Sequence, residues 1–183
     1  MSTTPHDPAP HAHAGRPEVT LSTRSGIAIR VRPVRPTDEA DLRALLEHIT
    51  SDDLRFRFLS AVPHVGDAQI AAMLSVDHVT SENFLAFESD SGKLVATAMI
   101  AADAELSTAE VAISIHRDYK GKGIGWSLLD YTAKCARERG IGKLQSIESH
   151  DNRAAIELER EMGFTTRPYP GDPTLTLVEI SLK

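Results

Sequence analysis

The segment 113–129 constrains this chain more than any other, because an apolar strand there runs into a glycine- and lysine-rich turn that opens a helix. The turn, residues 120–125, reads Lys-Gly-Lys-Gly-Ile-Gly. Its glycines remove side chains where the backbone must approach another group closely. The N-terminus of a helix exposes unpaired N–H groups and partial positive charge, which suit a phosphate, and the two lysines add full charges. The segment therefore predicts a cradle for a pyrophosphate.

Two common phosphate-binding motifs do not fit this turn. A P-loop needs Lys and then Ser or Thr after its last glycine, whereas Trp126 follows Gly125 here. A dinucleotide-binding fingerprint reads G-x-G-x-x-G, and the third glycine of this turn comes one place early. The turn instead resembles the Q/R-x-x-G-x-G/A signature of the GNAT superfamily of acyl-CoA-dependent N-acyltransferases, with Lys120 at the Gln/Arg position. A loop that merely joins a strand to a helix is the alternative.

Length, charge and cysteine content exclude several classes of protein. The 183 residues suit one domain with a substantial core. A net charge of −6 argues against a nucleic-acid-binding protein. The single cysteine, Cys135, excludes a disulfide framework and a cysteine-based zinc site, and its place in a predicted helix favours a core position. No apolar run is long enough for a membrane span, and no signal-peptide pattern is present. We expect a cytoplasmic protein without a metal.

The first 18 residues differ from the rest of the chain. They consist of proline, histidine, alanine and small polar residues without apolar periodicity, which predicts a disordered tail over 1–18 and a single domain over 19–183. The tail histidines His6, His11 and His13 have no partner that could orient them, so we do not expect a metal site there.

Hydrophobic periodicity predicts alternating groups of strands and helices in the domain. The predicted strands cover 27–35, 84–87, 93–102, 109–115, 144–147 and 175–182. The predicted helices cover 37–49, 51–58, 67–74, 123–139 and 152–162, with Thr37, Ser51 and Asp67 as expected caps. The strands joined by the long helix should be parallel, with a right-handed crossover.

This order of elements also resembles the GNAT fold, and a further motif agrees with it. Residues 152–164 resemble the N-x-x-A-x-x-L-Y-x-x-x-G-F segment of that family, with Glu159 at the tyrosine position. Within the superfamily, residues 19–182 are similar to the catalytic domain of bacterial protein lysine acetyltransferases. The matching segments are 32–38, 54–60, 109–115 and 118–125. The resemblance implies an α/β fold of mixed α+β type: a single GNAT-like domain with a central mixed, mostly antiparallel sheet flanked by helices.

An amine attacks a thioester only as the free base, and a lysine amine with a pKa of about 10.4 is mostly protonated at neutral pH. A general base is therefore expected. Glu110 is the first candidate, because a glutamate at this motif position is the general base in the similar lysine acetyltransferases. The residues alone favour a solvated strand glutamate without a role, and the motif match reverses this preference. Glu82, Glu105 and Glu148 are alternatives without motif support.

The resemblance also implies the contacts to acetyl-CoA. The backbone of Ile113, Ser114 and Ile115 should pair with the pantetheine arm, as an added strand would. Asn152 should reach the pantetheine or phosphate region, with Arg117 and Arg153 as weaker candidates for the ribose phosphate. The diphosphate should bind to Lys120, Gly121, Lys122, Gly123, Ile124, Gly125, Trp126 and Ser127.

The general acid for the leaving thiolate has no candidate by resemblance, because Glu159 replaces the tyrosine that many GNAT enzymes use. His116 borders the predicted cofactor strand, where we expect a surface histidine. The acid is left open between water, the new ammonium group and another side chain.

Three functions from two classes fit the sequence. The first is an acetyltransferase that moves an acetyl group from acetyl-CoA to a lysine of a protein, with an acyl-CoA synthetase among the candidate substrates. The second acetylates a small amine, such as an amino acid, a polyamine or an aminoglycoside. The third is a non-catalytic module that senses acyl-CoA; Glu110 argues against it, and the missing tyrosine argues slightly for it.

Overall fold

The computed structural model of the protein describes residues 16–58 and 66–183. Its strands are β1 (Val19–Ser22), β2 (Ala28–Pro33), β3 (Ser81–Glu88), β4 (Leu94–Ala102), β5 (Thr108–Ile115), β6 (Lys143–Ser149), β7 (Thr165–Pro168) and β8 (Leu175–Ser181). Its α-helices are α1 (Glu39–Glu47), α2 (Ser51–Phe58), α3 (Asp67–Leu74), α4 (Ile124–Glu138) and α5 (Arg153–Glu161). Single 3-10 turns, η1 (Pro36–Asp38) and η2 (Arg117–Tyr119), precede α1 and α4.

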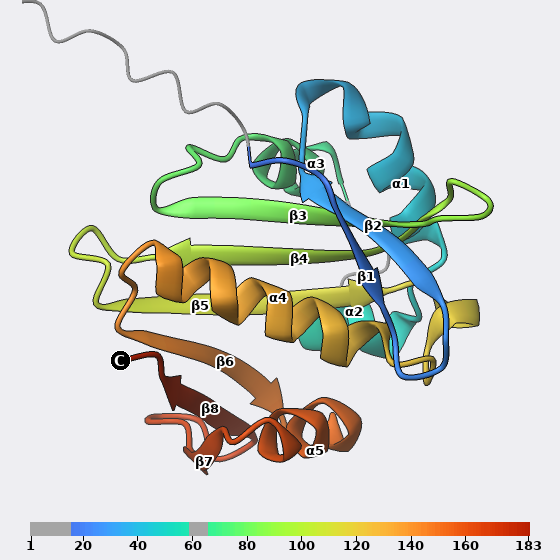
Figure 1. Ribbon diagram of the computed structural model, residues 1–183. Coiled ribbons are helices and arrows are strands. Elements are labelled where there is room, and N and C mark those ends of the chain that lie inside the picture. The colour runs from blue at the N-terminus through green and yellow to red at the C-terminus, as the bar shows by residue number, and fades with distance from the viewer. Residues whose placement is uncertain (1–15, 59–65) are drawn as a thin grey trace, which may run out of the picture.

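The strands form one eight-stranded sheet in the order β1-β2-β3-β4-β5-β6-β8-β7 (Figure 1). Neighbouring strands are antiparallel except β5 and β6, which are parallel and are joined by α4. A parallel pair needs a long crossover connection, and the helix provides it. The predicted fold class is confirmed: a mixed, mostly antiparallel sheet flanked by helices.

Strands β5 and β6 pair over only part of their length. Their register runs from Thr108↔Lys143 to Glu110↔Gln145, although β5 continues to Ile115 and β6 to Ser149. Beyond Glu110 the two strands therefore separate. The edge of β5 that faces β6 is left without a strand partner from residue 111 onward, which opens a gap inside the sheet.

The two faces of the sheet carry separate cores. On one face, α4 buries Ile124, Leu128 and Leu129 against residues of β2 to β6. On the other face, Leu42, Leu45 and Leu46 of α1, with residues of α3, pack on alternate residues of the same strands. Alternation along β3 divides the two cores, because Phe84 and Ala86 join the first, and Leu85 and Phe87 join the second.

The sequence did not predict the short strands β1 and β7. β1 pairs antiparallel with β2, and β7 pairs antiparallel with β8. Both have four residues and lie at the two ends of the sheet. Strands of this length carry too few alternating positions for periodicity to reveal them, and pairing with a longer neighbour specifies them instead.

The expected helix caps were wrong by one residue each. The N-cap of α1 is Asp38 rather than Thr37, because η1 comes first. The Asp38 side chain makes no cap bond to α1 and instead accepts bonds from the Arg32 guanidinium and the Arg35 N–H. For α2, the Thr50 hydroxyl accepts from the Asp53 N–H over 3.2 Å, one residue before Ser51. Gly66, not Asp67, precedes the first turn of α3.

Most of the predicted tail, residues 1–15, and the end of the 54–60 motif lie outside the described residues. The described end of the predicted tail makes surface contacts. The Arg16 guanidinium donates to the Glu138 carboxylate over 2.7 Å, and Glu18 accepts from Arg30 over 3.1 Å. Both pairs attach this end to the sheet and α4.

Candidate active site

A cavity of about 410 Å³ occupies the gap between β5 and β6. One wall is β5 from Glu110 to Ile115, and the facing wall is Ile147 and Glu148 of β6. The glycine-rich loop and the start of α4 close one end, and α5 forms a further wall. The separation of two parallel strands thus produces an elongated site with free β5 backbone along one side.

The cavity brings together eleven of the thirteen residues that the sequence assigned to the site. They are Glu110, Ile113, Ser114, Ile115, Lys120, Gly121, Gly123, Ile124, Gly125, Trp126 and Asn152. Lys122 and Ser127 do not line it. The Lys122 ammonium lies 4.7 Å from the centre of the Tyr119 ring, and Ser127 is buried within α4.

Backbone geometry explains the glycines of the loop. Gly121 and Gly123 have φ angles of 70° and 75°, which other residues rarely adopt. At Gly123, which caps α4, a Cβ atom would also lie 3.2 Å from the Arg24 nitrogen. The loop is thus packed against the turn between β1 and β2, where the Ser25 hydroxyl donates to the Lys122 carbonyl over 2.7 Å. That contact was not predictable from the loop itself.

Gly125 allows the first turn of α4 to approach the cavity walls. A Cβ atom there would lie 3.2 Å from Ile115 Cδ1 and 3.4 Å from Leu158 Cδ1. The first N–H groups of a helix have no partner within the helix. Because Gly123 to Trp126 line the cavity, this end of α4 presents those groups to it. The geometry suits the diphosphate of a nucleotide.

Lys120 is held by a charge partner. Its ammonium lies 2.7 Å from the Asp53 carboxylate of α2, which also accepts a bond from Thr50. Of the two weaker phosphate candidates, Arg117 donates to the carbonyls of Glu47 and His48, and the exposed Arg153 does not line the cavity. The ion pair of Lys120 therefore ties the loop to α2.

Glu110 is the last residue of β5 that pairs with β6, and its side chain is exposed and lines the cavity. Its neighbours Ala109 and Val111 belong to the core beneath α4. Because side chains alternate along a strand, Glu110 faces the opposite side of the sheet, toward α2. A carboxylate here reaches the gap from the α2 side.

Two further carboxyl groups border the cavity. Glu148 of β6 accepts a bond from the Asn152 amide over 2.6 Å, and burial raises the pKa of Glu148 to about 7, with a smaller contribution from Glu110. Glu159 of α5 accepts a bond from the Ser146 hydroxyl over 2.5 Å. Burial, and then the charge of Glu148, raise the pKa of Glu159 to about 8. In both groups the shift favours the protonated form, and it is larger for Glu159 than for Glu148.

The sequence could have shown that Glu159 is unusual. Ala155, Glu159 and Met162 share one face of α5 at helical spacing, and the neighbours of Glu159 on this face are apolar. A carboxyl group on the inward face of an amphipathic helix is expensive to bury. A carboxyl group in such a position indicates a candidate functional site. Comparison with the family motif alone had shown only that the tyrosine is absent at Glu159.

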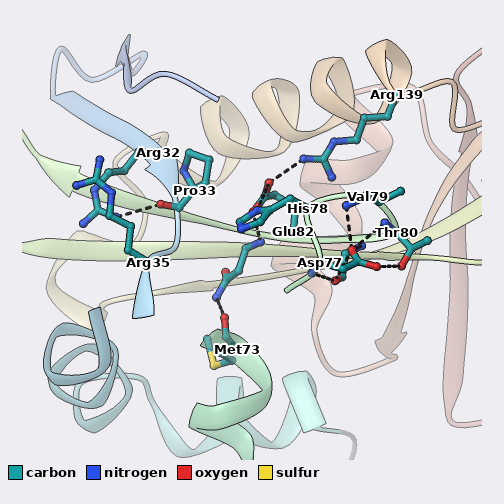
Figure 2. A network of polar contacts seen from close by, with 12 residues as sticks. Arg32, Pro33, Arg35, Met73, Asp77, His78, Val79, Thr80, Glu82 and Arg139 are labelled. Carbon is teal, nitrogen blue, oxygen red and sulfur yellow. Dashed lines mark hydrogen bonds and ion pairs between the residues drawn. The ribbon is translucent and has the colours of Figure 1, made fainter. Parts of the chain in front are cut away.

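The alternative bases Glu82 and Glu105 lie outside the cavity lining. Glu82 is 2% exposed and lies between the His78 ring, 3.1 Å away, and the Arg139 guanidinium, which donates over 2.8 Å (Figure 2). This network joins β3 to the end of α4, so Glu82 has a structural role. Glu105 is exposed in the turn before β5.

His116 is not the surface residue that the sequence predicted, since it is 1% exposed. Its ring packs between His48 and Tyr119, with centroids 4.6 and 5.5 Å away, and Nε2 lies 2.8 Å from Lys93 Nζ. Burial, and then the Lys93 charge, lower the pKa of His116. A neutral ring packed in this way serves the fold.

The described residues offer neither a metal site of clustered side chains nor a membrane-spanning helix. Residues 16–58 and 66–183 contain no group of three or more His, Cys, Asp or Glu side chains that could hold a metal ion. In the same part of the chain, no helix is long and apolar enough to cross a membrane.

The fold, the glycine-rich helix start and the gap between parallel strands define an acetyltransferase of the GNAT family, and the chain belongs to it. The model of the acetyltransferase (GNAT) family matches residues 44–164. The protein is therefore an N-acetyltransferase by family. Acetyltransferase PA5475 of Pseudomonas aeruginosa is 28% identical over 163 residues, which cover 88% of each chain.

Two solved structures illustrate the similarity of the fold. The GNAT domain of S. lividans PAT has a TM-score of 0.82 at 24% identity, over 90% of this chain and 96% of that one. Spermidine N-acetyltransferase from Vibrio cholerae, in complex with CoA and spermine, has a TM-score of 0.69 at 14% identity, over 84% and 95%. The family model establishes the family, and the two structures share the fold.

Proposed function

We propose that the protein transfers the acetyl group of acetyl-CoA to the side-chain amine of a lysine in a protein substrate. One observation carries this proposal: the exposed carboxyl group of Glu110 lies in the cavity wall where β5 and β6 separate. A base at this point can accept a proton from an amine that enters from the α2 side of the sheet.

Acetyl-CoA fits the cavity as an extended molecule. The start of α4 and the loop from Lys120 would hold the diphosphate, because they line one end of the cavity and the first N–H groups of the helix have no partner within it. The unpaired edge of β5 from Val111 to Ile115 would bond the pantetheine amides as an added strand does. The acetyl group would then lie near Glu110, at the inner end of the gap.

Catalysis requires a neutral amine close to a polarised carbonyl. Glu110 removes the amine proton as nitrogen attacks the acetyl carbon, either directly or through a water molecule. The free N–H groups of β5 stabilise the negative charge that develops on the carbonyl oxygen. A positioned base of this kind typically contributes about 10²- to 10⁴-fold to the rate.

A protein lysine is favoured as acceptor by two features. The segments 32–38 and 109–115 are similar to those of bacterial protein lysine acetyltransferases. Glu110 is also exposed, so that a lysine presented on a protein surface can reach it. A polyamine is the second candidate, because Glu148 and Glu159 add carboxyl groups to the same cavity, and one structural relative is a spermidine N-acetyltransferase.

Incubation with labelled acetyl-CoA tests the acceptor. The enzyme is mixed in parallel with dialysed lysate protein and with a panel of polyamines and amino acids, and acetyl-lysine is located by mass spectrometry. We expect label in protein lysines with the wild type and its loss with Glu110→Gln. Label that enters only the polyamines would replace the proposal by the second candidate. Bound acetyl-CoA without any transfer would indicate a sensor module.

A further inference from the structure

Glu159 is a buried acid that the chemistry above does not use. Its side chain is 5% exposed and lines the cavity. The Ser146 hydroxyl donates to Oε1 over 2.5 Å. The other oxygen, Oε2, is buried and has no hydrogen-bond partner among the described residues. A buried carboxyl oxygen without a partner is costly unless it carries a proton or meets a ligand.

The place of Glu159 in the gap follows from the register of β6. Gln145 is the last residue of β6 that pairs with β5, so Ser146 is the first residue beyond the point of separation. The bond to Ser146 therefore places the Glu159 carboxyl group at the inner end of the gap. This is the end at which Glu110 lies on β5.

Glu110 and Glu159 reach this end from opposite faces of the sheet. Glu110 faces α2, as described above. Leu144 belongs to the core beneath α4, and Ser146 shares its face because side chains alternate. A thioester in the gap would thus meet the base on one side and Glu159 on the other. In the tetrahedral intermediate of acyl transfer, nitrogen and sulfur are separate substituents of the reacting carbon, so a base and an acid can act on them from different directions.

We propose that Glu159 is the residue that donates a proton to the sulfur of CoA as the acetyl group leaves. This rests on the proposed function in that the acetyl donor is acetyl-CoA. The new bond joins the amine nitrogen to the acetyl carbon, and the carbon–sulfur bond breaks with its electron pair on sulfur. Glu110 takes the amine proton, Oε2 of Glu159 gives its proton to sulfur, and exchange with solvent restores both carboxyl groups.

The surroundings keep Glu159 in the protonated form that this step requires. Burial and then the Glu148 charge raise the pKa of Glu159 to about 8, close to the pKa of about 8.5 of an ordinary thiol. The titratable groups that face it are Glu148 on β6 and, beyond Glu148, Glu110 on β5. The nearby guanidinium groups are engaged elsewhere: Arg160 donates to Thr166, and Arg167 donates to Glu179.

The test compares Glu159→Gln with the exposed control Glu161→Gln on the same helix. Glutamine retains the shape and neutrality of the protonated acid but has no acidic proton to give. We expect unchanged acetyl-CoA affinity and a kcat lower by about 10- to 100-fold. The expected loss of kcat is at or below the low end of the range for general acids, because a thiolate is a good leaving group even without a proton. Glu161→Gln should match the wild type.

The pH profile separates a chemical role from a structural one. Wild-type kcat should fall above about pH 8, where Glu159 loses its proton, and Glu159→Gln should lack this alkaline decline. In Glu148→Gln the decline should move to lower pH, because the removed charge had raised the pKa of Glu159. The assay measures the release of free CoA and uses any amine that the enzyme accepts. The result is therefore independent of the identity of the acceptor.

Two results would overturn the proposal. One is a kcat of Glu159→Gln equal to that of the wild type. The other is a lower kcat that keeps the alkaline decline, since this would indicate a packing role only. Both results can be told apart from a failure of the proposed function. In that case the folded enzyme would acetylate another amine and no protein lysine.

Discussion

The Lys120 ammonium lies 2.7 Å from the Asp53 carboxylate, which joins the glycine-rich loop to α2. Lys120 occupies the Gln/Arg position of the family signature, yet here its charge is already paired. The side chain of Lys120 is 47% exposed, so the pair is a surface pair of modest strength.

We predict that Asp53→Asn binds acetyl-CoA more tightly, by about 2- to 5-fold, or roughly 0.5–1 kcal/mol. The change removes a negative charge beside the phosphates and releases Lys120 for them. The gain should shrink as salt is raised, because exposed charges are screened. Isothermal titration at two salt concentrations measures it, with Asp41→Asn on α1 as control. Weaker binding would mean that the pair is needed to hold the loop.

Gly123→Asp should weaken acetyl-CoA binding by more than about 2 kcal/mol. The new side chain meets the Arg24 backbone and is strained at a φ of 75°, so the loop must shift, and it adds charge of the same sign as the phosphates. Gly92→Asp is a matched control, because Gly92 also has a positive φ, of 71°, but does not line the cavity. Unchanged affinity in a folded Gly123→Asp protein would disprove the cradle.

Glu110→Gln should leave acetyl-CoA binding near normal and lower kcat by about 10²-fold or more. Residual activity should climb toward high pH, where free amine is available without a base. Glu105→Gln, an exposed glutamate before the same strand, should behave as the wild type. Circular dichroism checks the fold, and wild-type turnover in a folded Glu110→Gln protein would exclude Glu110 as the base.

The free energy of unfolding should fall as pH rises from about 5 to 7. Folding raises the pKa of Glu148 to about 7 and that of Glu159 to about 8, so the folded state binds more protons than the unfolded chain in this range. The stabilisation from these groups is complete below their unfolded pKa of about 4.5 and is lost as pH rises through the folded values. His116, with a lowered pKa, acts in the opposite direction.

Urea unfolding at pH 5 and pH 7 measures this slope. Because His116 is present in every variant, the difference between wild type and Glu159→Gln isolates the contribution of Glu159. We expect a smaller decline with pH in Glu159→Gln and an unchanged decline in Glu161→Gln. Equal declines in all three proteins would show that Glu159 ionises in the folded state as in the unfolded chain.

A protein that begins at Glu18 should keep the melting temperature and acetyl-CoA affinity of the full chain. The deletion removes one described ion pair, Arg16–Glu138, in which Glu138 is 61% exposed. Such a surface pair contributes about 0–1 kcal/mol. Differential scanning fluorimetry and calorimetry test this, and a marked loss of either property would show that the removed residues stabilise the domain or its site.

Local patterns in the sequence were sufficient for the long elements and for the loop. The alternation in β4 and β5 and the apolar stripe of α4 lie where periodicity predicted them. The glycines at 121 and 123 have the positive φ angles that explain their presence. The caps at Thr37 and Ser51 were wrong by one residue, because η1 precedes α1 and the Thr50 hydroxyl accepts from the Asp53 N–H at the start of α2.

The sequence by itself determined the fold class, the family and the place of the glycine-rich loop before α4, since these depend on periodicity and on neighbouring residues. Only the tertiary structure decided what lies together across the chain. It placed Glu159 against Ser146, paired Lys120 with Asp53 and buried His116. The physical reason is that burial and charge contacts between distant segments, which no local pattern records, set the ionisation of a carboxyl or an imidazole. Glu159 therefore stands only as a missing tyrosine in the sequence motif, whereas in the fold it is a buried carboxyl group with a raised pKa.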